Sequence, residues 1–190
     1  YLSNMLPRDR PNLSREELLQ MMAAKFPEYK WDWDKYPVFV AEIRGYYKQM
    51  GGNKLGNDVG IYDDACFIVG ESFFEAYNYN IDPAVLKDGM PFIKEGIWEV
   101  YKLDLHNKAY LALCQRLGPA EFFRYNSKGA PISERKSIGA NLHSGGITNT
   151  NSKGCGTVPP WQWVEFIYNL VKLDREGRND GVVPRVVMNN

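Results

Sequence analysis

Residues 65–79, ACFIVGESFFEAYNY, carry the pattern that decides the fold class. The run at 65–69 is apolar and the run at 74–79 is rich in aromatic residues, as is typical of strands. Between them, Gly70, Glu71 and Ser72 form a short segment of turn-forming residues. The stretch therefore predicts a β-hairpin.

Further strands are expected on both sides of this hairpin. Segment 38–47 is rich in β-branched and aromatic residues, and strand-like composition also occurs at 97–105, 121–125, 138–143 and 182–188, with a mixed pattern at 110–116. Turn residues gather at 81–91 and at 51–58, and the second of these segments lacks the Gly-Lys-Ser/Thr ending of a phosphate-binding loop. The body of the chain is therefore expected to be mainly β.

Two helices are expected beside this body. Ser14 and Glu17 are spaced as a capping box before an apolar stripe, which predicts a short helix over about residues 15–25. Prolines at 159 and 160 suit a first helical turn, and apolar residues then recur at helical spacing from Trp161 towards Gly177. We expect residues 1–35 to form an N-terminal arm and helix, and residues 36–190 a single domain.

The composition narrows the classes of function. The chain has 190 residues, 44% of them hydrophobic, which suffices for a domain that folds without a disulfide or a metal. Lys plus Arg and Asp plus Glu each number 23, so the net charge is zero and no nucleic-acid partner is expected. The sequence contains neither 18 consecutive apolar residues nor a signal peptide, so no membrane span and no secretion signal are expected.

The three cysteines differ in their surroundings. They cannot all pair, and none has the Cys-x-x-Cys spacing of a zinc or redox motif. Cys66 and Cys114 lie in apolar runs and are expected to be buried as small hydrophobic residues. Cys155 lies between glycines in a polar stretch, which makes it the candidate for chemistry.

That stretch, residues 141–163, reads NLHSGGITNTNSKGCGTVPPWQW. A thiol attacks as its thiolate, so Cys155 needs a base, and His143 lies twelve positions before it. Gly154 and Gly156 allow a sharp turn in which backbone N–H groups point at a developing oxyanion. The hydroxyls of Ser144 and Ser152 are candidates to orient the histidine or to bind substrate.

Two other interpretations of the stretch remain open. One is a polar surface loop without chemistry. The other is a zinc site made by His143, Cys155 and His106, although these positions lack the closely spaced ligand pairs of common zinc motifs.

Leu142-His143-Ser144, followed by Ser152-Lys153-Gly154-Cys155 and a proline-containing turn, resembles the catalytic signature of the L,D-transpeptidase family of the YkuD type, in a compact form found in phage and effector relatives. The resemblance implies that Cys155 is the nucleophile and His143 its base, that Ser152 and Gly154 shape the turn, and that Ser144 orients the base. It also implies a β-rich α+β fold in which residues 36–190 form a catalytic β-sandwich or barrel. Lys153 stands where the family usually has a histidine.

The resemblance implies a cysteine enzyme that acts on amide bonds of peptidoglycan stem peptides, without a cofactor. Whether it is an L,D-carboxypeptidase, an endopeptidase or a transpeptidase stays open. It would work in the bacterial periplasm or cell wall, delivered by a phage or an antibacterial secretion system, with a delivery or immunity partner. The alternative is a glycan-binding or structural module in which Cys155 is inert and aromatic residues stack on sugars.

Residues outside the motif are assigned to substrate binding. Arg44 is the candidate for holding a substrate carboxylate through two parallel hydrogen bonds, although a surface charge is the simpler interpretation. Trp161 or His106 is expected to wall the site, and Gly145 and Gly146 are further candidates for substrate binding.

Overall fold

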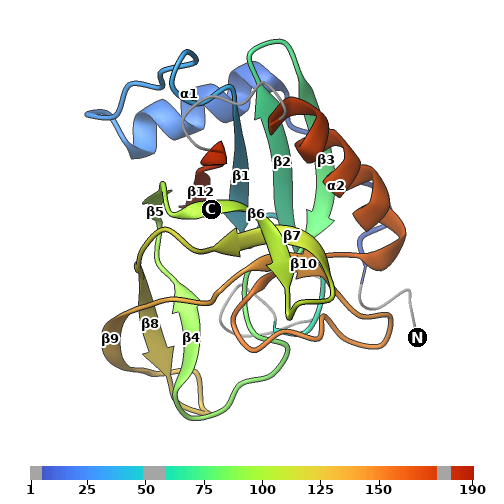
Figure 1. The fold of residues 1–190 in the computed structure, drawn as a ribbon. Coiled ribbons are helices and arrows are strands. Elements are labelled where there is room, and N and C mark those ends of the chain that lie inside the picture. The colour runs from blue at the N-terminus through green and yellow to red at the C-terminus, as the bar shows by residue number, and fades with distance from the viewer. Residues whose placement is uncertain (1–5, 49–58, 175–180) are drawn as a thin grey trace.

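The computed structural model describes residues 6–48, 59–174 and 181–190 (Figure 1). The predicted loop at 51–58 and the expected helix end at Gly177 lie outside the described residues. The two helices are α1 (Arg15–Lys25) and α2 (Pro160–Asp174). The capping box before α1 is present, because the Ser14 hydroxyl accepts from the Glu17 N–H and the Glu17 carboxylate accepts from the Ser14 N–H.

The largest sheet has five strands in the order β3-β2-β1-β12-β5. They are β1 (Val38–Arg44), β2 (Asp64–Gly70), β3 (Phe74–Tyr79), β5 (Gly96–Trp98) and β12 (Arg185–Asn189). β2 and β3 form the predicted antiparallel hairpin, and β1 pairs in parallel with β12. The C-terminal strand therefore lies inside the sheet, between β1 and β5.

Both faces of this sheet are covered, which explains why β1 and β2 are almost continuously apolar. On one face, Leu18 and Met22 of α1 pack against alternate residues of the sheet such as Phe39. On the other face, Val40 and its neighbours pack against a second sheet and against α2 (Figure 1). These two layers of side chains form the core.

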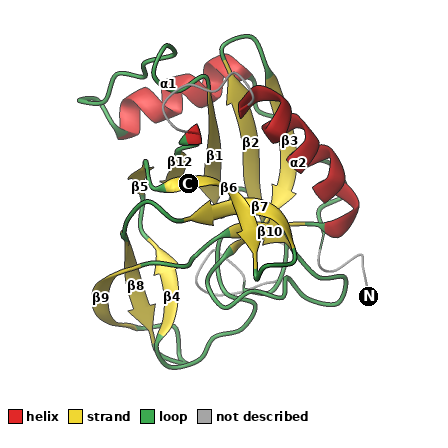
Figure 2. Ribbon diagram, viewed as in Figure 1, coloured by secondary structure: helices red, strands yellow, loops and turns green. Residues whose placement is uncertain are grey.

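The second sheet has the order β11-β10-β7-β6. A third sheet has the order β4-β8-β9 (Figure 2). The strands of the second sheet are β6 (Tyr101–His106), β7 (Tyr110–Gln115), β10 (Leu142–Ser144) and β11 (Gly156–Val158). Those of the third are β4 (Met90–Ile93), β8 (Ala120–Tyr125) and β9 (Pro131–Ser137). The expected β-rich α+β class is confirmed, and the described strands form these open sheets and no closed barrel.

Several strand predictions need correction. The segment expected as one strand at 97–105 is two strands, β5 and β6, because they pair with partners in different sheets. β4 and β9 were not expected, since β4 follows turn residues and β9 is a largely exposed edge strand of mixed polarity. The final strand, β12, begins at Arg185 and not at residue 182. Each difference reflects long-range pairing, which local composition does not encode.

Candidate functional site

The topology brings the two ends of the Cys motif together. β10 and β11 are parallel neighbours, with Leu142 opposite Gly156 and His143 opposite Thr157. Cys155 directly precedes β11, so it lies beside the strand that carries His143. Both side chains line one cleft of about 720 Å³. The other lining residues are Ala84, Val85, Lys87, Met90, His106, Asn107, Ala109, Tyr110, Ser144, Asn149, Asn151, Ser152 and Lys153.

The His143 ring is oriented by a backbone carbonyl. Its Nδ1 lies 2.8 Å from the Ser144 carbonyl oxygen, which can only accept, so Nδ1 carries the proton. The neutral ring therefore has its lone pair on Nε2, the atom available to act as a base. Burial lowers the pKa of His143 to about 4, although the Ser144 carbonyl acts in the opposite direction. At neutral pH the ring is uncharged.

Cys155 is a half-buried free thiol. Burial raises the pKa of Cys155 above its ordinary value, while the Asn141 backbone N–H and the positive charge of Arg185 act to lower it. The resting cleft therefore holds a thiol, which donates to the Gly139 carbonyl oxygen at 3.8 Å, and a neutral imidazole. The environment of the thiol does not maintain a thiolate, so a nucleophilic role would require transfer of its proton to a base.

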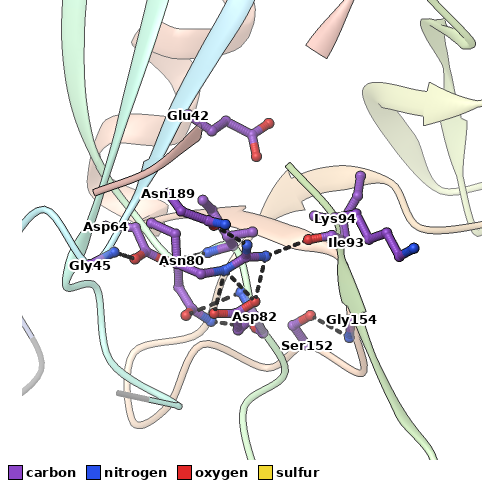
Figure 3. A network of polar contacts seen from close by, with 12 residues as sticks. Glu42, Gly45, Asp64, Asn80, Asp82, Ile93, Lys94, Ser152, Gly154 and Asn189 are labelled. Atoms are coloured by element: carbon purple, nitrogen blue, oxygen red, sulfur yellow. Dashed lines mark hydrogen bonds and ion pairs between the residues drawn. The ribbon is translucent and has the colours of Figure 1, made fainter. Parts of the chain in front are cut away.

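Ser152 holds the turn that presents the thiol. Its hydroxyl donates to the Cys155 carbonyl oxygen at 2.6 Å and accepts from the Gly154 N–H at 3.0 Å, a bond drawn in Figure 3. The Gly156 N–H donates to the Asn141 carbonyl oxygen at 2.9 Å. The amides of both glycines are thus committed to the turn and the sheet and are not free to donate to an oxyanion.

A buried ion pair lies beneath the cysteine turn, and it was not predicted from the sequence. Arg185 of β12 and Glu42 of β1 are fully buried and joined by two hydrogen bonds of 2.5 and 2.8 Å. A Cβ atom on Gly156 would lie 1.6 Å from the Tyr79 hydroxyl oxygen and 3.0 Å from Arg185 Nη2. Only glycine fits this position. The available sequence signal was a charged residue inside each of two apolar segments, Glu42 in 38–43 and Arg185 in 182–188.

Arg44 lies outside the cleft. Its guanidinium pairs with Asp82 at 3.0 Å and also donates to the Asn189 side-chain oxygen and the Ile93 carbonyl oxygen, each at 2.7 Å (Figure 3). It borders a separate cavity of about 240 Å³. Its hydrogen-bonding capacity is largely used within the chain, so the geometry gives no support to a substrate carboxylate at this residue.

Gly145, Gly146 and Trp161 contact Tyr62. The Tyr62 hydroxyl donates to the Gly146 carbonyl oxygen at 2.8 Å, and a Cβ atom on Gly145 would lie 2.2 Å from the same hydroxyl oxygen. Trp161 meets the Tyr62 ring edge-on at 6.4 Å and does not line the cleft. These residues therefore anchor the loop between β10 and β11. Among the walls that were expected from the sequence, His106 is the one placed in the cleft.

The described residues contain no group of three or more His, Cys, Asp or Glu side chains that could hold a metal ion. The zinc alternative thus finds no ligand set in that part of the chain. None of the helices described is long and apolar enough to cross a membrane. Comparison of the chain with protein families, with curated proteins and with solved structures finds no match.

Proposed function

We propose that the protein is a cysteine enzyme that cuts or exchanges amide bonds of peptidoglycan stem peptides, with Cys155 as nucleophile and His143 as base. The observation that carries the proposal is the shared cleft, in which an oriented neutral imidazole and a free thiol are presented from adjacent strands. A base oriented by a third group beside a nucleophile is the arrangement that covalent catalysis requires. The likeness to the L,D-transpeptidase signature supports the choice of substrate.

The reaction proceeds by proton transfer and acyl transfer. His143 Nε2 takes the proton of the Cys155 thiol as the sulfur attacks the substrate carbonyl, and the resulting imidazolium gives that proton to the leaving amine. The acyl group is then on sulfur. Attack by water, with His143 again as base, makes the protein a hydrolase, whereas attack by a second amine makes it a transpeptidase. Both routes restore the thiol.

The charges of the cleft favour a substrate with a carboxylate. Among the described residues that line it, the charged ones are Lys87 and Lys153, and both are exposed to solvent. Neither makes an ion pair within the described part of the chain. The ammonium groups would attract the carboxylate of a stem peptide, which is the role first assigned to Arg44. Lys153 also occupies the position directly before the Gly-Cys pair.

The test is turnover of diaminopimelate-containing muropeptides by Cys155→Ala, followed by chromatography and mass spectrometry. We expect loss of at least about 10⁴-fold in kcat with the fold intact. Cys114→Ala, which removes a buried thiol, should keep its activity if it folds. A product that gains water identifies hydrolysis, and a product that gains a second peptide identifies exchange. Full activity of Cys155→Ala would eliminate the proposal.

A non-catalytic glycan-binding module is the second candidate. The observation that favours it is the commitment of the Gly154 and Gly156 amides, which reduces the donors available for an oxyanion. Titration of the protein with a stem-free glycan chain separates the two candidates. Saturable binding by wild type and Cys155→Ala alike, with no turnover of muropeptides, would support the module.

A further inference from the structure

His106 stacks on His143 inside the cleft. The two ring centroids are 4.2 Å apart and the ring planes differ by 22°. His106 comes from the end of β6 and His143 from β10, and 36 residues separate them in the chain. The mechanism described above makes no use of His106. A flat ring stacked on His143 restricts the rotation of the His143 side chain. The position of His106 therefore affects the orientation of His143.

The placement of His106 is determined by Asn141. The Gln115 backbone N–H donates to Asn141 Oδ1 at 2.9 Å, and this identifies the oxygen of the side-chain amide, because a backbone N–H can only donate. Asn141 Nδ2 then lies 2.9 Å from His106 Nδ1 and must donate to it. His106 Nδ1 is therefore unprotonated. The proton of the neutral His106 ring is then on Nε2. Asn107 Nδ2 lies 3.1 Å from Nε2, so this tautomer requires the exposed Asn107 amide to turn its oxygen toward the ring.

The two stacked rings therefore have opposite tautomers. His143 carries its proton on Nδ1, because the Ser144 carbonyl accepts from it, and His106 carries its proton on Nε2. Asn141 also keeps His106 neutral, since protonation of Nδ1 would bring two donors face to face. A neutral neighbour allows His143 to become an imidazolium during the reaction, whereas a charged neighbour at this distance would oppose it.

We propose that His106, held by Asn141, is a positioning residue that keeps the His143 ring in the orientation that a general base requires. The inference rests on the proposed function for its catalytic meaning, but the arrangement itself can be measured without a substrate. Asn141 links the two parts of the site, because its backbone N–H acts to lower the pKa of Cys155 and its side chain bonds His106.

Other ionisable groups surround the stacked pair. They are Asp104, Tyr110, Cys114 and Arg116 from β6, β7 and the residue after β7, Lys87 from the loop before β4, and Lys153 and Cys155 from the loop before β11. Burial lowers the pKa of His106, and the charge of Arg116 acts in the same direction. Both effects agree with a neutral His106 at neutral pH.

The first test is nuclear magnetic resonance of protein labelled with ¹⁵N-histidine. The chain has 2 histidines, so the spectrum contains two imidazoles, and His106→Phe assigns them. We expect a protonated Nδ1 for His143 and a protonated Nε2 for His106. In Asn141→Asp the carboxylate still accepts from Gln115 but cannot donate, so His106 Nδ1 should become protonated. The same tautomer on both rings, or an unchanged His106 in Asn141→Asp, would overturn the proposal.

The second test is steady-state kinetics of the full chain with muropeptides. His106→Ala should lower kcat by about 10- to 100-fold with little change in KM, because a displaced base reacts slowly while binding persists. His106→Phe, which keeps a flat ring, should recover part of this loss. Leu105→Ala, at the exposed neighbouring position, is the control. Wild-type kcat in His106→Ala would refute the positioning role.

The two tests also separate this inference from the proposed function. If the tautomers are opposite and respond to Asn141→Asp, but Cys155→Ala turns over muropeptides as wild type does, the arrangement stands and the proposed enzyme does not. If Cys155→Ala is inactive while His106→Ala is unaffected, the enzyme stands and the role of His106 is wrong.

Discussion

Replacing Glu42 with glutamine should destabilise the fold and, at the same time, make the Cys155 thiol more acidic. Glu42 and Arg185 are fully buried and joined by two hydrogen bonds, and Arg185 also donates to the Tyr101 hydroxyl at 3.0 Å. Glutamine keeps the shape of the side chain but leaves the guanidinium charge without a counter-charge. Breaking a buried pair in this way costs about 3–5 kcal/mol.

The size of the change can be stated for both readouts. In a chain of this length each kcal/mol lowers the unfolding midpoint by about 2–4 °C, so Glu42→Gln should lose roughly 6–20 °C. Arg185 already acts to lower the pKa of Cys155. Once Glu42 no longer offsets that charge, the pKa of the thiol should fall further. Each pKa unit of this fall increases the thiolate fraction near neutral pH by up to about tenfold, and the alkylation rate rises with it.

Thermal unfolding by circular dichroism measures the first effect, and the pH dependence of iodoacetamide alkylation at Cys155 measures the second. Glu134→Gln is the matched control, since Glu134 pairs with Lys94 but its side chain is 61% exposed. It should leave both readouts nearly unchanged. A lower midpoint without faster alkylation of Glu42→Gln would show that Arg185 acts on structure alone. An unchanged midpoint would refute the argument about the buried pair.

Three further predictions concern single residues of the site. The pKa of His143 is about 4 in the folded chain against an ordinary 6.5, so the unfolded chain binds a proton first as the pH falls. The free energy of unfolding should therefore be retained above pH 6.5 and drop by about 3 kcal/mol by pH 4. Denaturant midpoints measured across this range should show a smaller drop in His143→Gln. Gly156→Ala should cost about 1–3 kcal/mol or more in thermal unfolding, because its Cβ atom would overlap the buried Tyr79 hydroxyl. Ser152→Ala should lower the free energy of unfolding in urea by about 1–3 kcal/mol and slow turnover, because the buried Gly154 N–H loses its acceptor. Wild-type stability of this variant would show that the turn does not need the hydroxyl.

The parts of the fold that follow from local sequence were predicted well. The hairpin at 65–79, the capping box at Ser14 and the helix after Pro160 each depend on residues within one element or its turn. β9 was missed because its residues are mostly exposed and its strand character comes from pairing with β8. The parallel pairing of β1 with β12 joins residues more than 140 positions apart, and no local pattern reports it.

The residues of the candidate site also differ in whether local sequence could predict them. His143, Ser152 and Cys155 could be proposed because they lie within 13 residues of one another in a stretch of unusual composition. The contacts of His106 and Arg185 could not, because each reaches the cysteine region from a strand of its own. Candidate reactive groups are easier to identify from a sequence than the groups that orient them, since orientation is a property of packing.

The protonation state of the site follows from that packing. Burial alone raises the pKa of Cys155 and lowers the pKa of His143, so both groups are neutral for the same reason. A substrate that fills the cleft removes more water and strengthens this preference, which means that a stable thiolate–imidazolium pair is not the resting form. In the proposed reaction, charge separation would then coincide with attack on the substrate carbonyl. The Asn141 N–H and the positive charge of Arg185, which both act to lower the pKa of Cys155, are in place before the reaction begins and require no rearrangement when the charge appears.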